Sequence, residues 1–207
     1  MKKLQTILLS ILFLSNMCFA LTFPIDFNDC KQIGKMIVLT GWFHEVRVYG
    51  EHQSYDIPAN QGVDIKSCEL GEVIKTGFEY PKYDSVHKIW RSGYGNYIDI
   101  GYFDIIKTPI GEIKRMKYFY RYAHMEKPAS TVGDPIYEGQ KIGEVGATGI
   151  VDLQGRPIKA FHLHMEKRLP NGVKIPCLSN FTPLVQKYFG IETKKVFATI
   201  GSKTSNN

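Results

Sequence analysis

Alternation of polar and apolar residues is clearest in residues 161–166, near the end of the chain. In a β-strand, a period of two points His162, His164 and Glu166 to one face and the apolar residues between them to the other. Such a strand would hold two imidazoles side by side, and neutral imidazole is a common zinc ligand and a common general base. A His-x-His pair alone is equally typical of surface histidines on an edge strand, so the remaining sequence has to separate the two interpretations.

Strand patterns recur along the rest of the chain. Short apolar or alternating runs rich in β-branched and aromatic residues predict strands at 36–40, 43–49, 62–65, 71–74, 96–102, 118–123 and 173–175. The turn signal Thr108-Pro109-Ile110-Gly111 predicts a hairpin across residues 103–116. Glycines recur from 133 to 149 and argue against helices there. We therefore expect an all-β domain, a sandwich or barrel of antiparallel strands.

Two stretches read as loops and one as a helix. Residues 50–61 are polar and contain Pro58 and Asn60, which predicts a loop, and residues 80–95 predict a second, surface loop. Thr182-Pro183 is typical of a helix start, so a short helix is expected over 184–189. A polar tail follows it.

The N-terminus predicts export. Lys2 and Lys3 precede an apolar run at 7–14, and Cys18-Phe19-Ala20 places small residues where a signal peptidase reads. This pattern predicts a secretory signal cleaved after Ala20. The apolar run is short for a permanent membrane span, and an uncleaved anchor stays open as the alternative. Export to the periplasm or the outside of the cell follows from either form.

An exported chain folds where disulfides persist. Three cysteines remain after the signal, Cys30, Cys68 and Cys177, which permit one bridge and one free thiol. The sequence favours Cys30 with Cys177, because they lie near the two ends of the predicted domain. The expected organisation is a signal peptide (1–20), an N-terminal segment with the first strands (21–50), the main domain (51–178), and a helix with a polar tail (179–207).

Composition excludes one class of partner. The chain of 207 residues is 43% hydrophobic and 22% charged, which is ordinary for a globular protein. Its formal net charge of +6 falls to +4 without Lys2 and Lys3. The remaining cations are scattered along the chain, so nucleic acid binding is not indicated.

Five blocks of sequence follow one another in an order typical of a known enzyme family. They are Gly62-Val63-Asp64-Ile65 with Gly71-Glu72-Val73-Ile74, Gly93-Tyr94-Gly95-Asn96-Tyr97-Ile98, Tyr122-Ala123-His124-Met125, the glycine-rich segment 133–149, and His162-Leu163-His164-Met165-Glu166. Together they resemble the lysostaphin and LytM family of zinc endopeptidases, which cut peptide cross-links in bacterial peptidoglycan. The resemblance implies the LytM-type all-β fold, a duplicated hybrid motif, and peptidoglycan peptides as binding partners.

The resemblance also implies roles for four residues. Asp64 and His164 match two zinc ligands, and His124 and His162 match the two catalytic histidines that do not bind the metal. A metal held by three protein groups keeps a fourth position for water, whose pKa it lowers. The implied cofactor is therefore zinc.

One departure from the family pattern changes the expected activity. The family's first motif reads His-x-Gly-x-Asp, and aligning its aspartate with Asp64 places Asn60 at the histidine. An amide oxygen suits calcium better than zinc, so this alignment predicts weak zinc binding. It also predicts that Asn60→His would tighten zinc binding. His52, in the expected loop upstream, is the residue that could substitute for the missing ligand.

Three functions follow from this reading. The first is an exported LytM-like protein directed at peptidoglycan whose endopeptidase activity is impaired by Asn60. The second is an active zinc endopeptidase with a compensated ligand set. The third is a non-catalytic module that binds wall peptides or activates a partner such as a cell-wall amidase.

Overall fold

The structure, a computed structural model, describes residues 22–33, 36–37, 39, 41, 43–47 and 50–177. Every regular element in these ranges is a β-strand, which confirms the all-β prediction. The predicted signal peptide, C-terminal helix and polar tail lie outside the described residues. Within the described ranges no helix is long and apolar enough to cross a membrane.

Fifteen short and long strands make up the described fold. They are β1 (Gln32–Ile33), β2 (Met36–Ile37), β3 (Glu45–Arg47), β4 (Gly50–His52), β5 (Tyr55–Pro58), β6 (Asp64–Lys66), β7 (Gly71–Glu79), β8 (Lys82–Asp84), β9 (Ile89–Arg91), β10 (Gly95–Thr108), β11 (Gly111–Pro128), β12 (Pro135–Ile136), β13 (Lys141–Val145), β14 (His162–Arg168) and β15 (Lys174–Ile175).

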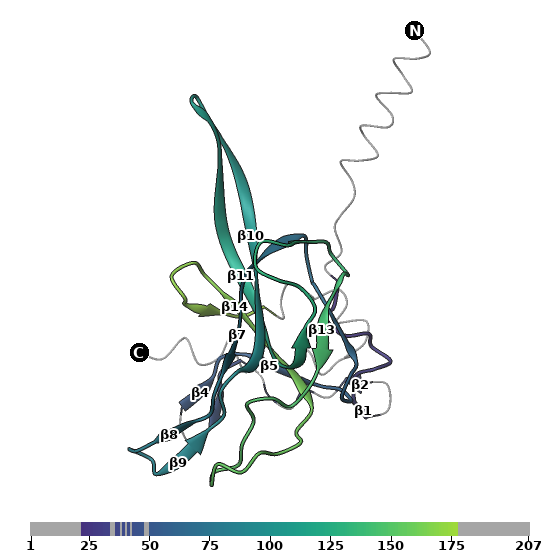
Figure 1. Ribbon diagram of the computed structural model, residues 1–207, viewed down its shortest axis with the longest axis vertical. Helices are drawn as coiled ribbons and strands as arrows, with labels where there is room; N and C mark the ends of the chain where they lie inside the picture. Colours follow the sequence, from purple (N-terminus) through teal and green to yellow (C-terminus); the bar gives the residue numbers. More distant parts are fainter. Residues whose placement is uncertain are drawn as a thin grey trace, which may run out of the picture.

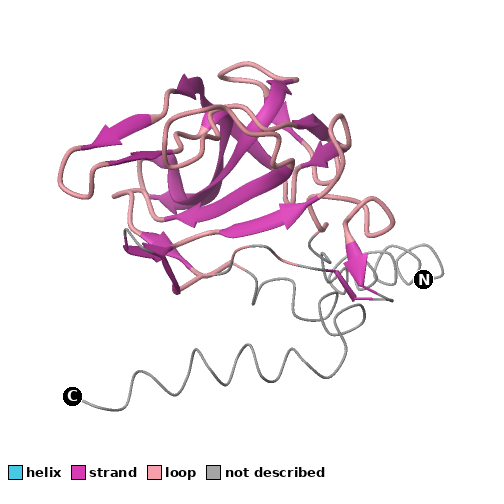
Figure 2. Cartoon of the chain, turned by 90° about the horizontal axis from the view of Figure 1, so that it is seen from below, coloured by secondary structure: helices cyan, strands magenta, loops and turns pink. Residues whose placement is uncertain are grey.

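Nine of the strands form one curled antiparallel sheet (Figures 1 and 2). Its main path runs β12-β7-β10-β11-β13-β6, while β14 pairs with β11, β5 and β15. Strand β11 is long enough to pair with β14 in its middle and with β13 near its end. The remaining pairs β1–β2, β3–β4 and β8–β9 are small separate hairpins or ribbons.

The hairpin of β10 and β11 confirms the turn predicted at 108–111. Thr108 pairs with Gly111, and the Thr108 hydroxyl donates to the Gly111 carbonyl at 2.7 Å. Its far end projects from the body (Figure 1), and Ile110 at the turn is 95% exposed.

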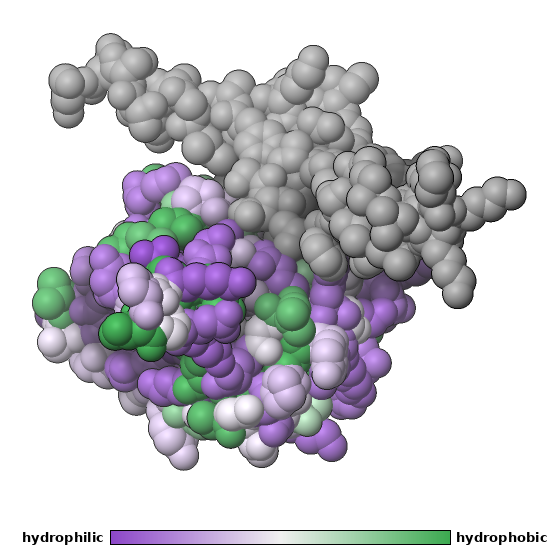
Figure 3. Space-filling view, turned by 90° about the horizontal axis from the view of Figure 1, so that it is seen from above, coloured by the Kyte–Doolittle hydropathy of each residue, from purple (hydrophilic) through white to green (hydrophobic). Residues whose placement is uncertain are grey.

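The surface seen from above is largely hydrophilic with small separated hydrophobic patches (Figure 3).

The core lies on the sheet face that carries the apolar half of the β14 pattern. Leu163 is fully buried and pairs with Ile57 of β5, while Met165 pairs with Tyr122 of β11. Each of these apolar side chains contributes about 1.5–3 kcal/mol by leaving water. This burial fixes the register of β14, so that His162, His164 and Glu166 share the opposite face.

The prediction of a loop over 50–61 is wrong, because β4 and β5 lie there. Turn-forming residues such as Pro58 suggested a loop, but β5 pairs with β14 along its whole length and Ile57 enters the core. Proline is tolerated at this position because Pro58 ends the strand. The predicted surface loop at 80–95 likewise contains the β8–β9 hairpin.

The cysteines differ from the expectation as well. Cys30, Cys68 and Cys177 are buried free thiols, contrary to the predicted Cys30–Cys177 disulfide. The Cys30 sulfur instead lies 3.5 Å from the Asp26 carbonyl oxygen. Burial raises the pKa of the Cys30 thiol to about 12, so this thiol is unreactive at neutral pH.

Candidate metal centre

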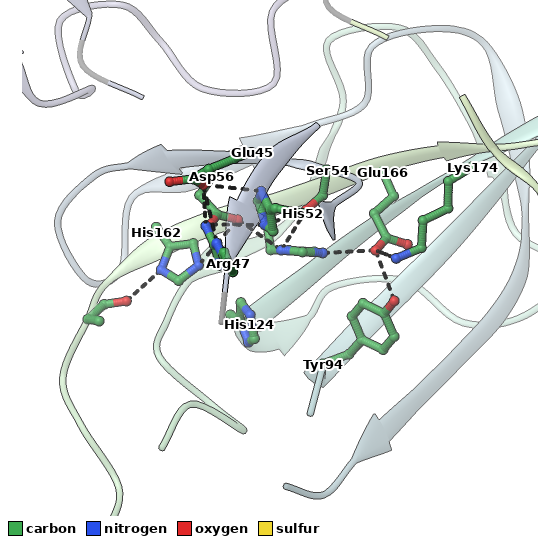
Figure 4. Close-up of polar contacts among 12 residues, drawn as sticks. Glu45, Arg47, His52, Ser54, Asp56, Tyr94, His124, His162, Glu166 and Lys174 are labelled. Atoms are coloured by element: carbon green, nitrogen blue, oxygen red, sulfur yellow. Dashed lines mark hydrogen bonds and ion pairs between the residues drawn. The ribbon is translucent and has the colours of Figure 1, made fainter. Parts of the chain in front are cut away.

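Pairing of β5 with β14 brings a carboxylate against the two histidines of the alternating segment. Asp56 lies directly opposite His164, and His162 lies opposite Pro58 two residues along the same pair of strands. Because opposite residues in an antiparallel pair point to the same face, the Asp56 carboxylate and the His164 ring meet there. Figure 4 shows Asp56 of β5 and His162 of β14 close to His52 of β4 and His124 of β11.

Three donor atoms form a compact group. Asp56 Oδ1 lies 2.9 Å from His164 Nδ1, and Asp56 Oδ2 lies 3.2 Å from His52 Nε2. The ligand atoms of His52, Asp56 and His164 all lie within 4.8 Å of one another. Two imidazoles and one carboxylate are the donor set of a catalytic zinc site that keeps one position open. The residues present therefore fit a zinc ion.

Charges in this group are strongly coupled. Burial disfavours the charged form of Asp56, but hydrogen bonds with His164 and His52 hold its pKa well below the usual range. Burial likewise opposes protonation of His164, yet its hydrogen bonds with Asp56 and Glu166 raise its pKa to about 9. In the metal-free protein His164 is therefore an imidazolium at neutral pH, wedged between two carboxylates.

A second group places two more histidines beside the first. The rings of His124 and His162 are 4.9 Å apart between centroids, and His124 is 5.3 Å from the His164 ring. The His124 backbone has a φ of 58°, which is uncommon for a non-glycine residue and is a form of strain found at functional sites. Its amide donates to the Tyr94 carbonyl at 2.8 Å, which holds this conformation.

Backbone carbonyls settle the proton positions on these two rings. His124 Nδ1 is 2.9 Å from the Thr148 carbonyl, and His162 Nδ1 is 2.7 Å from the Ala160 carbonyl. A carbonyl only accepts, so each Nδ1 carries the proton and each Nε2 keeps its lone pair. Burial lowers the pKa of both rings, that of His124 to about 3, so both are neutral at pH 7.

Two side chains border the ligand group. Arg47 Nη2 lies 3.0 Å from Asp56 Oδ2 and 2.9 Å from Glu45 Oε2, so its charge is shared between two carboxylates. The Ser54 hydroxyl lies 2.6 Å from His52 Nε2 and 3.4 Å from His164 Nδ1, against the two nitrogens that face the site. Both residues line a cavity of ≈ 380 Å³ that gives access to the histidines.

The structure brings together three of the four site residues predicted from the sequence. His124, His162 and His164 converge, whereas Asp64 on β6 is half-exposed and forms an ion pair with Lys141 at 2.7 Å. Asn60 is exposed and does not line the cavity. Alignment of the first motif with 60–64 is therefore not supported by the geometry, which places Asp56 where Asp64 was expected.

His52 and Asp56 are the two residues that the sequence reasoning missed as a pair. The signal was present, because His52-Gln53-Ser54-Tyr55-Asp56 has the same four-residue spacing as His-x-Gly-x-Asp. Ser54 stands where the pattern has glycine, which made this match harder to recognise. Gly62 gave the segment 60–64 a closer apparent match to the pattern. The sequence pattern predicts a loop at His52, whereas His52 is the last residue of β4.

Known proteins resemble this chain in sequence and in fold. The model of Peptidase family M23 matches residues 50–176. Among solved structures, a zinc-containing peptidase from Vibrio cholerae superposes with a TM-score of 0.50 and 23% identity over 75% of this chain and 39% of its own. A Pseudomonas aeruginosa protein assigned to peptidase M23 superposes with a TM-score of 0.51 and 19% identity. The match covers 80% of this chain and 51% of that protein.

The catalytic domain of lysostaphin from Staphylococcus simulans gives a TM-score of 0.49 and 21% identity over 75% of this chain and 95% of that domain. The match with this chain spans 39% of the length of the Vibrio cholerae peptidase and 51% of the length of the Pseudomonas aeruginosa protein. No curated protein matches the chain.

Proposed function

The chain belongs to peptidase family M23, and from this premise we propose that it is an exported zinc endopeptidase that cuts peptide cross-links in peptidoglycan. The family resemblance carried by the five sequence blocks is thereby confirmed. The observation that carries the proposal is the donor set of His52, Asp56 and His164, with their ligand atoms within 4.8 Å of one another. The sequence alone predicts impaired activity because of Asn60, and the donor set of His52, Asp56 and His164 favours the active enzyme instead.

A zinc ion in this donor set would polarise the scissile carbonyl and lower the pKa of the attacking water. The neutral rings of His124 and His162 stand beside it with their Nε2 lone pairs available, since each Nδ1–H is bound to a carbonyl oxygen. Either Nε2 can accept a proton from the attacking water. The resulting imidazolium can then donate it to the leaving amine.

The cavity supports a peptide substrate. It is lined by residues of β4, by the segment from Arg91 to Tyr94, and by the site histidines. Both carboxylates and cations line it, among them Glu79, Arg91 and Lys174. Such a mixed rim suits the polar, charged peptides of a bacterial wall. Export is proposed from the signal pattern at residues 1–20.

The test is digestion of purified peptidoglycan by the purified protein, with mass spectrometry of the released peptides. We expect cleaved cross-links from the parent protein, loss of cleavage and of zinc in His52→Ala, and loss of cleavage with zinc retained in His162→Ala. His87→Ala serves as the matched control, since His87 lies on the exposed β8–β9 hairpin. A zinc-loaded parent that leaves every cross-link intact would contradict the proposal and favour a non-catalytic, peptide-binding role.

A further inference from the structure

Glu166 is a buried carboxylate that the proposed reaction does not use directly. It is 1% exposed and lies on the same face of β14 as His164. Four other side chains converge on it. They are Tyr94, His164, Arg168 and Lys174. A buried carboxylate with four polar or charged partners is expected to serve a specific role in the structure or the reaction.

The contact with His164 differs from the others because it reaches the far side of a proposed zinc ligand. His164 Nε2 lies 3.0 Å from Glu166 Oε1, while His164 Nδ1 faces Asp56 at 2.9 Å. An ionised carboxylate only accepts hydrogen bonds, so Nε2 must carry a proton. The lone pair of a neutral His164 ring is then on Nδ1, the nitrogen that faces the donor group.

Two cations contact the Glu166 carboxylate in addition to His164. Arg168 Nε lies 2.7 Å from Glu166 Oε2, and Lys174 Nζ lies 2.6 Å from Glu166 Oε1. The Tyr94 hydroxyl adds a further donor at 2.9 Å. The carboxylate charge is therefore balanced even when His164 is neutral, as a metal ligand must be.

We propose that Glu166 is a positioning residue of the metal centre, which holds the proton on His164 Nε2 and thereby presents the Nδ1 lone pair to the metal. This inference rests on the proposed function. The same contacts disfavour a flipped His164 ring. A flipped ring would place an unprotonated nitrogen against a carboxylate, or a proton where the metal has to bind.

Glu166→Gln tests this role because it keeps the shape of the side chain and changes its hydrogen-bonding groups. A glutamine can accept from His164 Nε2 only by turning its amide hydrogens toward Arg168, which is itself a donor. The opposite orientation offers a hydrogen to Nε2 and moves the ring proton to Nδ1. In both orientations the His164 Nδ1 lone pair is held less well for the metal, and we expect zinc binding to be about 10- to 100-fold weaker.

Tyr94→Phe is the matched control. It removes another hydrogen bond to the same Glu166 oxygen but keeps the ring that packs 5.5 Å from His164. If Glu166 served only as a hydrogen-bonding partner of the surrounding side chains, the two variants would lose zinc affinity to the same extent. We expect Tyr94→Phe to bind zinc as the parent does, measured for all three proteins by competition with a chelating dye at pH 7.5.

The second readout is the ring proton itself. In the zinc-loaded parent with ¹⁵N-labelled histidine, NMR should show a slowly exchanging proton on His164 Nε2, and Glu166→Gln should exchange it faster. Equal zinc affinity in the parent and Glu166→Gln, or a parent proton on Nδ1, would overturn the proposal. If Glu166→Gln does not fold, the parent spectrum decides. A parent that binds no zinc overturns the proposed function and this inference together, whereas a zinc-binding parent matched by Glu166→Gln overturns this inference alone.

Discussion

Asp56 and His164 lie directly opposite each other in the β5–β14 pair, with Asp56 Oδ1 2.9 Å from His164 Nδ1. Strand register thus places a carboxylate and an imidazole from positions 108 residues apart on one face. His52, the last residue of β4, completes the group from the neighbouring hairpin. The proposed zinc site depends on this strand pairing.

Loss of His52 should abolish tight zinc binding. His52→Ala removes one of three donors, and the two that remain cannot enclose the metal. We expect zinc affinity to fall by more than about 100-fold, since even a lost outer partner of a ligand costs about 10- to 100-fold. Calorimetric titration of the metal-free protein gives the measurement. His87→Ala, at an exposed histidine, should leave the affinity unchanged, and an equal loss in both variants would contradict the assignment.

Changes at the originally predicted motif should have no effect on zinc. Asn60 is exposed and Asp64 pairs with Lys141, away from the three histidines. Neither Asn60→His nor Asp64→Asn should therefore alter zinc affinity in the same titration. Tighter binding in Asn60→His would restore the earlier alignment, which expected this change to complete the ligand set.

Removal of the Ser54 hydroxyl should strengthen zinc binding. In the metal-free protein the hydroxyl is 2.6 Å from His52 Nε2, the nitrogen that the metal needs, so binding has to break this contact. A typical hydrogen bond contributes about 0.5–1.5 kcal/mol net, which corresponds to roughly a 2- to 10-fold gain in Ser54→Ala. Dye competition can resolve that range. Weaker binding in Ser54→Ala would instead mean that the hydroxyl supports the bound metal.

Zinc affinity should depend on pH through His164. Hydrogen bonds with Asp56 and Glu166 raise the pKa of this ring to about 9 in the metal-free protein, so below that pH a proton occupies Nδ1. Zinc has to displace it, and affinity should rise by roughly tenfold per pH unit from pH 7 and level off above about pH 9. Calorimetry in buffers of different ionisation enthalpy would report about one proton released per zinc. An affinity independent of pH between 7 and 9 would contradict this.

Stability should depend on the buried ion pair beside the site. Arg121 Nε and Nη2 lie 2.8 and 2.7 Å from the two Asp99 oxygens, and the guanidinium stacks on the rings of Tyr94 and Tyr97. Asp99→Asn leaves this buried cation without its counter-charge, so we expect a loss of about 3–5 kcal/mol in the free energy of unfolding. Urea denaturation measures it. Asp104→Asn, at a more exposed carboxylate on the same strand, should change little.

Sequence patterns predicted the sheet and three of the five residues of the candidate site for a clear physical reason. Period-two alternation in β14 is local, so His162 and His164 could be placed on one face without knowing the fold. Asp56 could not, because its role depends on a pairing between distant strands. Pro58 and Asn60 also gave the segment that contains β5 the sequence pattern of a loop. A spacing of four from His52 to Asp56 was the only sequence signal for the missed ligands, and Ser54 weakened it.

A crystal structure of the zinc-loaded protein, with diffraction data collected at the zinc absorption edge, would locate the metal. We predict one anomalous peak about 2.0–2.2 Å from His52 Nε2, Asp56 Oδ and His164 Nδ1. A peak beside Asp64 and Asn60, or no peak in a protein that retains its fold, would contradict it.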